Sequence, residues 1–358
     1  MGNGRSIILY PFSIIWRLIT DIRNFLYNSK ILKSHKFDIP VICIGNITVG
    51  GTGKTPHSEY LIELLRRKFS IALLSRGYKR KTKGFRFAVP GSGIADIGDE
   101  SLQISRKFPD ITVAVDGDRV RGVKNILAGK PETEVIILDD GYQHRRITPG
   151  LSILLSDFGR PLSGDYLLPY GDLRESAGNI NRADVILITK TPENLSVDEQ
   201  RLSESPPGRL SGQKVFYTAL RYLDPVPVSD KLSPGSLTFN LPECGILLIT
   251  GIANPKPLYD HLHKSCKEII HLLFGDHHNF TRRDIEKINY ARNSLGTERK
   301  YVFTTEKDAV RLRELPGIDE QLLSALYYIP VEIRFLYDKE EEFNNLIIDY
   351  VGKNKRNN

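Results

Sequence analysis

A glycine-rich segment between an apolar run and a helical pattern constrains this chain more than any other feature. Residues 41–56 read Val-Ile-Cys-Ile-Gly-Asn-Ile-Thr-Val-Gly-Gly-Thr-Gly-Lys-Thr-Pro. The β-branched start predicts a strand, and the closing Gly-Lys-Thr is typical of a phosphate-binding P-loop that opens a helix. In such a loop, backbone N–H groups and the helix N-terminus surround phosphate oxygens. The segment therefore predicts a nucleotide site in an α/β fold.

Two side chains of this loop have expected roles, and one position departs from the usual pattern. Lys54 can reach the β- and γ-phosphates, and the Thr55 hydroxyl can bind Mg²⁺. The usual pattern has a glycine five residues before the last glycine, where this chain has Thr48. The surrounding strand and helix still favour a P-loop over a simple glycine-rich turn.

Length and composition suggest two domains and an anionic partner. The 358 residues exceed a typical single domain, and 26% charged residues argue against a protein with several membrane spans. The net charge of +7 suits nucleotide, lipid phosphate or nucleic acid, and does not choose among them. Three widely spaced cysteines form neither a zinc pattern nor a disulfide framework.

Apolar runs alternate with helical patterns, which predicts βαβ units and a parallel sheet flanked by helices. A second alternating block follows after residue 245. Two β-branched and aromatic segments bracket it, and we expect them to pair as a two-stranded linker to a smaller α/β domain. The expected parts are an N-terminal helix (1–28), a core domain (29–212), the linker (213–224 and 326–336), the smaller domain (225–325), and a C-terminal helix with a polar tail (337–358).

A second candidate for nucleotide chemistry is the segment Glu-Val-Ile-Ile-Leu-Asp-Asp-Gly-Tyr-Gln-His at residues 134–144. An apolar strand that ends in a carboxylate is the Walker B arrangement, in which an aspartate binds or organises Mg²⁺. Adjacent residues of a strand point to opposite faces, so at most one of Asp139 and Asp140 should face the metal. Gln143 follows on the next loop. The alternative is an ordinary strand followed by a turn.

Asp99 and His277 are candidates for proton handling. Asp99 begins a predicted helix, where it is either an N-cap or a carboxylate that takes a proton from an acceptor hydroxyl. His277 and His278 follow Asp276, and adjacent histidines point apart, so a role in orienting or proton transfer is favoured over a metal site.

The N-terminal segment is amphipathic. Residues 7–27 place Ile14, Ile15, Leu18, Ile19 and Ile22 on one helical face. No apolar run is long enough to span a bilayer. Two alternatives remain: the apolar face packs on the protein's own core, or it lies in a membrane interface.

Taken in order along the chain, these motifs resemble the tetraacyldisaccharide 4′-kinase family, the lipid A 4′-kinases. The resemblance rests on the N-terminal apolar helix and the P-loop, whose threonine at position 48 the family shares. It also rests on Ser75–Tyr78, Gly98–Glu100, Asp139–His144, Leu173–Glu175, Gly251–Pro255, Asp276–His277 and Thr305–Asp308.

The resemblance implies an ATP-dependent kinase that phosphorylates the 4′-hydroxyl of a tetraacyl glucosamine disaccharide 1-phosphate, the lipid A precursor, at the cytoplasmic face of the bacterial inner membrane. The N-terminal helix would then lie on the membrane surface as a peripheral or monotopic anchor, and the cofactors would be ATP and Mg²⁺. Asp99 would be the base, paired with His277, with Lys54 as a third catalytic residue. The implied nucleotide-binding residues are Thr48, Val49, Gly50, Gly51, Thr52, Gly53, Lys54, Thr55, Gln143 and Arg174, and the implied residues around the metal are Thr55, Asp139, Asp140 and Glu175.

Two other functions fit parts of the sequence. A membrane-associated ATPase switch of the deviant P-loop class would share the Gly-Gly-Thr-Gly-Lys-Thr segment, but that class has a signature lysine where this chain has Val49. A nucleic-acid-dependent ATPase is suggested by net charge alone, without the interleaved basic and aromatic residues of such surfaces. We therefore expect no nucleic-acid partner, and no obligate protein partner.

Overall fold

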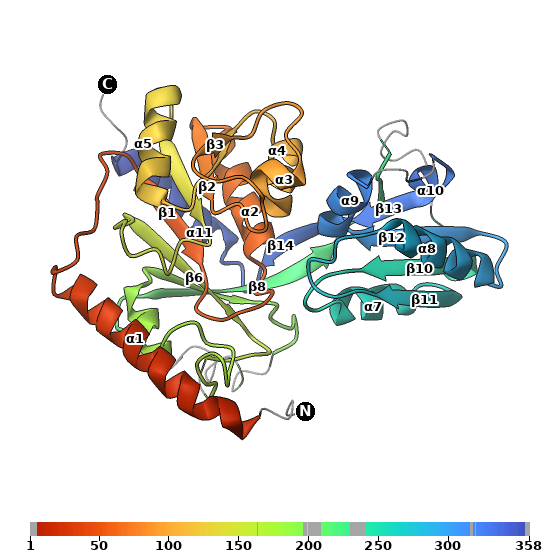
Figure 1. Cartoon of the computed structure of the whole chain (residues 1–358), viewed down its shortest axis with the longest axis horizontal. Helices are drawn as coiled ribbons and strands as arrows, with labels where there is room; N and C mark the ends of the chain where they lie inside the picture. Colours follow the sequence, from red (N-terminus) through yellow and green to blue (C-terminus); the bar gives the residue numbers. More distant parts are fainter. Residues whose placement is uncertain are drawn as a thin grey trace.

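The computed structural model describes residues 6–354 except 163, 196–198, 200–208, 230–238, 240, 316–317 and 319. Part of the predicted polar tail, residues 355–358, therefore lies outside the described residues. Two sheets lie side by side, each with helices packed against it (Figure 1). The alternating strands and helices that hydrophobic periodicity predicts are present in both blocks.

The larger sheet has nine strands within the described residues, in the order β14-β8-β7-β6-β1-β5-β2-β4-β3. Its central strands are parallel, and the two edge strands, β14 and β3, run antiparallel to their neighbours. This is the parallel sheet that the alternating pattern predicts. The strands are β1 (Val41–Gly45), β2 (Ile71–Ser75), β3 (Arg86–Phe87), β4 (Thr112–Val115), β5 (Val135–Asp139), β6 (Leu151–Asp157), β7 (Val185–Thr189), β8 (Lys214–Tyr222) and β14 (Val331–Phe335).

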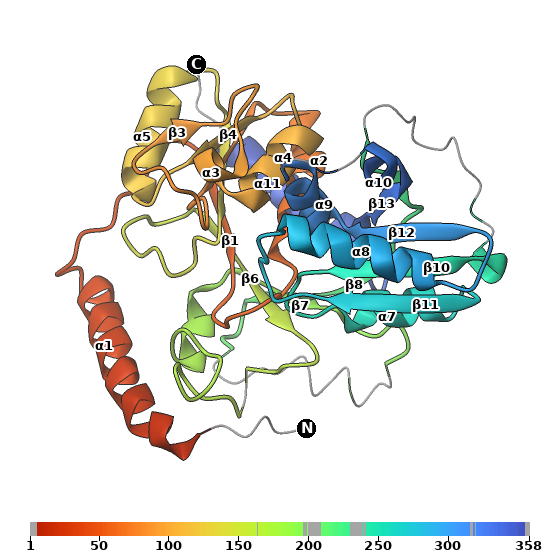
Figure 2. The ribbon, with the colours of Figure 1, turned by 45° about the vertical axis from the view of Figure 1, so that its right-hand side comes forward.

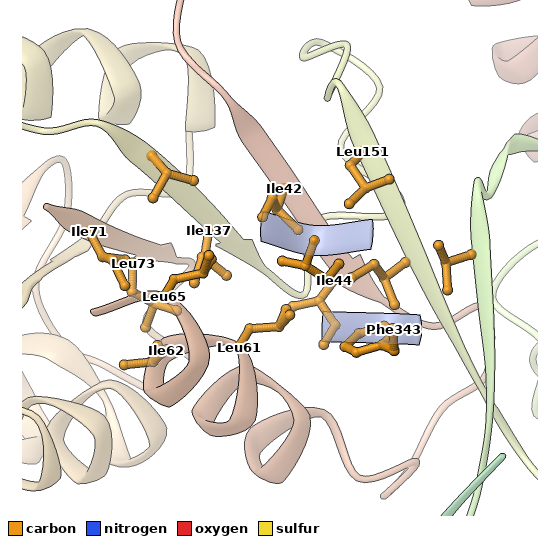
Figure 3. Close-up of a cluster of buried hydrophobic side chains, with 14 of the residues drawn as sticks. Ile42, Ile44, Leu61, Ile62, Leu65, Ile71, Leu73, Ile137, Leu151 and Phe343 are labelled. Carbon is orange, nitrogen blue, oxygen red and sulfur yellow. The ribbon is translucent and has the colours of Figure 1, made fainter. Parts of the chain in front are cut away.

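Both faces of the central part of this sheet are buried, so strands such as β1, β2, β5 and β7 are buried at every position rather than at alternate ones. In β1, Ile42 and Ile44 contribute to the core on one face, while Val41 and Cys43 contribute to the core on the other. Phe343 of the C-terminal helix lies against Ile44 on the first face (Figure 3). The helices of this domain are α2 (Lys54–Arg66), α3 (Ile94–Ile97), α4 (Asp99–Lys107), α5 (Arg119–Gly129), η2 (Ala177–Arg182) and α11 (Glu340–Asn354).

The smaller sheet has five strands within the described residues, in the order β11-β10-β12-β13-β9. Strand β9 is antiparallel to β13, and the other pairs are parallel. Helices α8 and α9 contribute to one of its two cores, and α7 to the other. The elements are β9 (Val226–Pro227), η3 (Leu241–Glu243), β10 (Gly245–Thr250), α7 (Lys256–His263), β11 (Glu268–Leu273), α8 (Arg282–Ser294), β12 (Lys300–Thr305), α9 (Glu306–Arg313), α10 (Glu320–Ala325) and β13 (Leu326–Ile329).

The chain passes between the two sheets along β8 and returns along β14, and these strands pair from Val331↔Tyr222 to Phe335↔Thr218. The linker is therefore two-stranded, but the prediction for residues 326–329 was wrong, because they form β13 inside the smaller sheet. Pro330 separates β13 from β14. Proline has no N–H to donate to a strand ladder, which explains why one β-rich segment divides into two strands at this residue.

Helix α1 (Tyr10–Asn28), which follows the short turn η1 (Ile7–Leu9), packs against the larger domain through its polar side. Ser13, Thr20 and Asn24 are buried, whereas the apolar side chains remain exposed to solvent. In both views the helix lies at the margin of the molecule (Figures 1 and 2). The alternative in which the apolar face packs on the protein's own core is thus contradicted. The exposed apolar residues of the segment are Ile7, Ile8, Leu9, Tyr10, Phe12, Ile14, Ile15, Trp16, Leu18, Ile19, Ile22 and Phe25.

No helix within the described ranges combines the length and the apolar character that crossing a membrane requires.

Candidate active site

A cavity of about 980 Å³ lies between the two domains at the P-loop. The larger domain contributes the P-loop, the end of β5 and one side of α1 to its walls. The smaller domain contributes residues 252–254, Asp276, His277 and residues 305–307. The carboxyl ends of parallel strands meet at one edge of a sheet, which is why motifs far apart in sequence gather here.

The backbone conformation of the P-loop explains why positions 50 and 53 are glycine and why position 48 can be threonine. Gly50 and Gly53 have φ values of +87° and +85°, a conformation that other residues rarely adopt. Thr48 instead forms a bridge with Leu173, beside hydrogen bonds from Val49 N to Asp172 O and from Arg174 N to Ile47 O. Because position 48 is extended, it does not require glycine.

Three side chains that sequence reasoning did not select form hydrogen bonds with backbone carbonyls of the P-loop. Thr189 donates a hydrogen bond from Oγ1 to Thr52 O at 2.9 Å, and the Lys190 ammonium donates to Gly51 O and to Asp157. His57 bridges Gly53 O and Thr218 Oγ1, and burial lowers the pKa of His57 to about 4. These residues come from β7, the end of β7 and α2, and no sequence motif marks them.

Asp139 and Asp140 both line the cavity. Strand alternation does not separate them, because Asp140 follows the end of β5 and has a φ of +48°. Asp139 is buried and accepts a hydrogen bond from Ser58 Oγ at 2.9 Å. Burial and the negative charges of Glu100 and Asp140 raise the pKa of Asp139. Both carboxylates therefore border the cavity, and the expectation that at most one of them faces the metal stays a prediction.

The second aspartate belongs to a charge cluster beside the P-loop. Lys54 Nζ lies 3.6 Å from Asp140 Oδ1, and Arg174 Nη1 lies 3.2 Å from the same oxygen. Although burial opposes it, these two cations hold the pKa of Asp140 below its usual value. The structure thus brings together Lys54, Asp140 and Arg174, three residues to which the resemblance assigns roles around nucleotide and metal.

Gln143 and Glu175 are more constrained than predicted. Gln143 donates from Nε2 to Asn46 O at 2.5 Å and to Glu175 Oε1 at 3.2 Å. Glu175 is buried, pairs with Arg182 at 2.6 Å and accepts a hydrogen bond from Asn24 of α1. Both carboxylate oxygens of Glu175 are therefore engaged by protein donors, and this residue fits a supporting role better than a metal-binding one.

Asp99 and His277 meet across the domain boundary. His277 Nδ1 lies 2.9 Å from Asp99 Oδ2, while His278 turns away to Asp284. Asp99 is the first residue of α4 and does not cap it, since Gly98 occupies the N-cap position. Although burial opposes it, His277, Lys307 and Arg311 lower the pKa of Asp99. His277 lines the cavity, whereas Asp99 is 4% exposed and lies behind it.

Helix α9 supplies two cations to this pair. Lys307 Nζ lies 3.0 Å from His277 Nε2 and 2.9 Å from Glu100 Oε1, and Arg311 pairs with Asp99. A lysine in the first turn of a helix opposes the helix dipole. In this structure a carboxylate of the other domain, Glu100, compensates it. Sequence reasoning did not identify Arg311, because it lies three residues beyond the Thr305–Asp308 motif and its pairing with Asp99 is a contact between distant parts of the chain.

The residues present fit a nucleoside triphosphate with a divalent cation. The backbone N–H groups of the loop and the Lys54 ammonium can bind phosphate oxygens. Asp139, Asp140 and the Thr55 hydroxyl supply the oxygen ligands that Mg²⁺ prefers. Within the described part of the chain, no group of three acidic, histidine or cysteine side chains is arranged so that it could hold a metal ion by itself. Mg²⁺ sites on nucleotides usually need just one or two protein oxygens, completed by phosphate and water.

Comparisons with known proteins identify the family to which this chain is similar. The sequence model of the family described as LpxK, tetraacyldisaccharide-1-P 4′-kinase, matches residues 5–351. A tetraacyldisaccharide 4′-kinase of Phocaeicola vulgatus is 45% identical over 98% of this chain and 96% of its own length. One of Parabacteroides distasonis is 43% identical over the same shares of each chain. The crystal structure of LpxK from Aquifex aeolicus in complex with ATP matches with a TM-score of 0.72 and 28% identity, over 96% of this chain and 98% of that one.

Proposed function

This chain belongs to the tetraacyldisaccharide-1-P 4′-kinase family, and we propose that the cavity between its domains is where it performs the family's reaction. In that reaction the γ-phosphoryl group of ATP passes to the 4′-hydroxyl of a tetraacyl disaccharide 1-phosphate, a precursor of lipid A. The observation that carries the proposal is the meeting of a P-loop from one domain with His277 of the other in a single cavity.

The P-loop would hold the triphosphate. Its backbone N–H groups and the N-terminus of α2 face the phosphates, and Lys54 neutralises charge on the transferring group. Arg174 pairs with the same Asp140 carboxylate as Lys54, and it is a second cation that can offset the charge of the transferring group. Phosphoryl transfer needs mainly positioning and charge neutralisation, which this arrangement supplies.

Thr55, Asp139 and Asp140 would hold Mg²⁺. When bound, this ion would offset the negative charge of the phosphate groups. Asp139 and Asp140 line the cavity close to Glu100 in a buried region, where a cation would relieve the repulsion among their carboxylates. We assign Glu175 a supporting role, because it is paired with Arg182.

The Asp99–His277 pair would accept the proton of the 4′-hydroxyl. His277 is the member that lines the cavity, so it lies closer to the acceptor, and Asp99 fixes its ring from behind. Lys307 also lines the cavity, so its ammonium can turn from His277 Nε2 to a phosphate oxygen and free that nitrogen. A positioned acid–base group contributes roughly 10²–10⁴ in rate.

Helix α1 would bring the enzyme to its substrate at the cytoplasmic surface of the inner membrane. A four-chain lipid leaves a bilayer only at great cost, at about 0.8 kcal/mol per CH₂ group. The exposed apolar face of α1 can enter the interface while its polar side stays bonded to the protein through Ser13, Trp16 and Asn24. Lys30, Lys33 and Lys36 follow the helix, are exposed, and would meet anionic headgroups.

The decisive assay measures transfer of radiolabelled γ-phosphate from ATP to the purified precursor disaccharide in neutral detergent micelles. We expect label in the glycolipid, dependent on both the acceptor and Mg²⁺. ATP hydrolysis that proceeds equally without acceptor would indicate a switch ATPase. Stimulation by oligonucleotides, with no labelled glycolipid, would indicate a nucleic-acid-dependent ATPase.

Membrane binding can be tested on the exposed face of α1. Replacing Ile15 and Ile22 by glutamate should weaken binding to vesicles of phosphatidylethanolamine and phosphatidylglycerol by roughly a hundredfold, because each isoleucine loses about 1.5 kcal/mol or more of burial. Both side chains are more than half exposed, so the fold should not change. Vesicle co-sedimentation measures the effect.

The matched control replaces two exposed apolar residues of the smaller domain, Leu273 and Tyr290, by glutamate. It adds the same charge and should leave vesicle binding unchanged. Equal losses in both double variants would mean that added charge, and not the face of α1, determines binding.

A further inference from the structure

Arg311 occupies an unusual position for a charged side chain, at the junction of the two domains. It is 7% exposed and lies on α9 of the smaller domain. Its guanidinium donates to Asp99 Oδ2 of the larger domain, from Nε at 3.0 Å and from Nη2 at 2.5 Å. From Nη1 it also donates to Gly251 O at 3.1 Å and to Asp308 Oδ1 at 2.8 Å. One side chain thus joins α4, the loop after β10 and α9.

The contacts around Asp99 fix the tautomer of His277. Lys307 is a donor, so His277 Nε2 accepts from it at 3.0 Å, and the ring proton must lie on Nδ1. Nδ1 then donates to Asp99 Oδ2, the oxygen that Arg311 also engages. Arg311 Nη2 lies 2.9 Å from Nδ1 because both groups donate to one oxygen. Asp99 Oδ1 accepts from Glu100 N at 2.9 Å, so both oxygens of the carboxylate are directed by named donors.

We infer that Arg311 is a positioning residue for the proposed kinase reaction: it fixes the Asp99 carboxylate so that His277 is held against the cavity wall in its Nδ1–H form when α9 lies on α4. This inference rests on the proposed function of the same site. A planar guanidinium with several donors can orient a carboxylate in a way that a lysine ammonium cannot. Since α9 belongs to the smaller domain, the orientation exists only while the domains are together.

The test compares Arg311→Gln with wild type in the labelled-phosphate assay. We expect kcat to fall on the order of 10²-fold, since a misplaced reacting group costs about that much, while KM for ATP and for the disaccharide changes little. Arg311→Lys keeps the charge and should recover part of kcat. Arg283→Gln, the same substitution at an exposed position on α8, is the matched control and should behave as wild type.

A purely structural role would not alter the pH profile, so this is the second readout. Glu100, His277, Lys307 and Arg311 surround Asp99, and Asp308 shares Arg311 with it. Without Arg311 less positive charge holds the pKa of Asp99 down, so the acid limb of kcat against pH should move to higher pH. An unchanged acid limb together with no recovery in Arg311→Lys would overturn the inference.

Removing Arg311 deprives the buried Asp308 of the cation with which it pairs, and the loss can impair folding. The double variant Asp308→Asn/Arg311→Gln removes both charges and should show the same loss of kcat, with ATP binding by calorimetry as the check of folding. A folded double variant with wild-type kcat would contradict the positioning role. Absence of transfer in the wild type itself would instead refute the proposed function.

Discussion

Replacing Lys54 by alanine should reduce phosphoryl transfer by roughly 10²–10³-fold, since removal of one preorganised charge-stabilising donor has about that effect. Lys54 is the first residue of α2, directly after the glycines of the phosphate-binding loop, and it lines the cavity. Its ion-pair partner within the described residues, Asp140, keeps Arg174 in the variant. The protein should therefore fold, and the loss should appear in kcat/KM measured with labelled ATP.

Lys68→Ala provides the control for this prediction. Lys68 follows α2, is exposed, and should tolerate alanine without loss of activity. Equal melting temperatures for the two variants would show that the lost activity is not a loss of fold. A Lys54→Ala protein that transfers phosphate at the wild-type rate would remove the P-loop from the mechanism.

Asparagine at position 99 should lower kcat by roughly 10²–10⁴-fold with little change in ATP affinity. The amide keeps the size of the carboxylate but removes its charge. If its NH₂ group replaces Oδ2, it opposes two donors, His277 Nδ1–H and Arg311. The imidazole then loses its orientation, and any proton it accepts loses a compensating charge.

A double variant provides a sharper form of this prediction. If Asp99 and His277 act as one unit, Asp99→Asn/His277→Ala should be scarcely slower than either single variant. Multiplicative losses would show that the two residues act separately. Asp110→Asn, on an exposed aspartate that pairs with Arg66, is the control and should keep full activity.

The sequence predicted the parallel sheet and the P-loop because both have strong local signatures. A buried strand such as β1 is apolar at each position, and Gly50 and Gly53 are required by the backbone that they adopt. The same locality explains the error at residues 326–336. One β-rich run was interpreted as one strand, although Pro330 ends the first ladder and the next residues join the other sheet.

The motifs of the site could be predicted from the sequence, but the residues that hold those motifs in place could not. Asp139 and Lys54 lie in recognisable segments, whereas Lys190, His57 and Arg311 act through contacts between residues far apart in sequence. The Arg311–Asp99 pair, for example, spans 212 positions. Such contacts depend on how the two domains pack together, and the hydrophobic periodicity within one segment does not predict that packing. The exposed face of α1 is a similar case, since the pattern alone fitted burial and interface equally.

The route of the chain between its two sheets has a consequence for biosynthesis. The smaller domain is inserted between β8 and β14, and the core of the larger domain includes Phe343, Ile347 and Val351 from the last helix. A chain emerging from a ribosome can complete the inserted domain first, because all its strands precede β14. The core of the nucleotide-binding domain is complete only when α11 has been made and packs against the sheet. During translation the enzyme thus stays incompetent until α11 has been made.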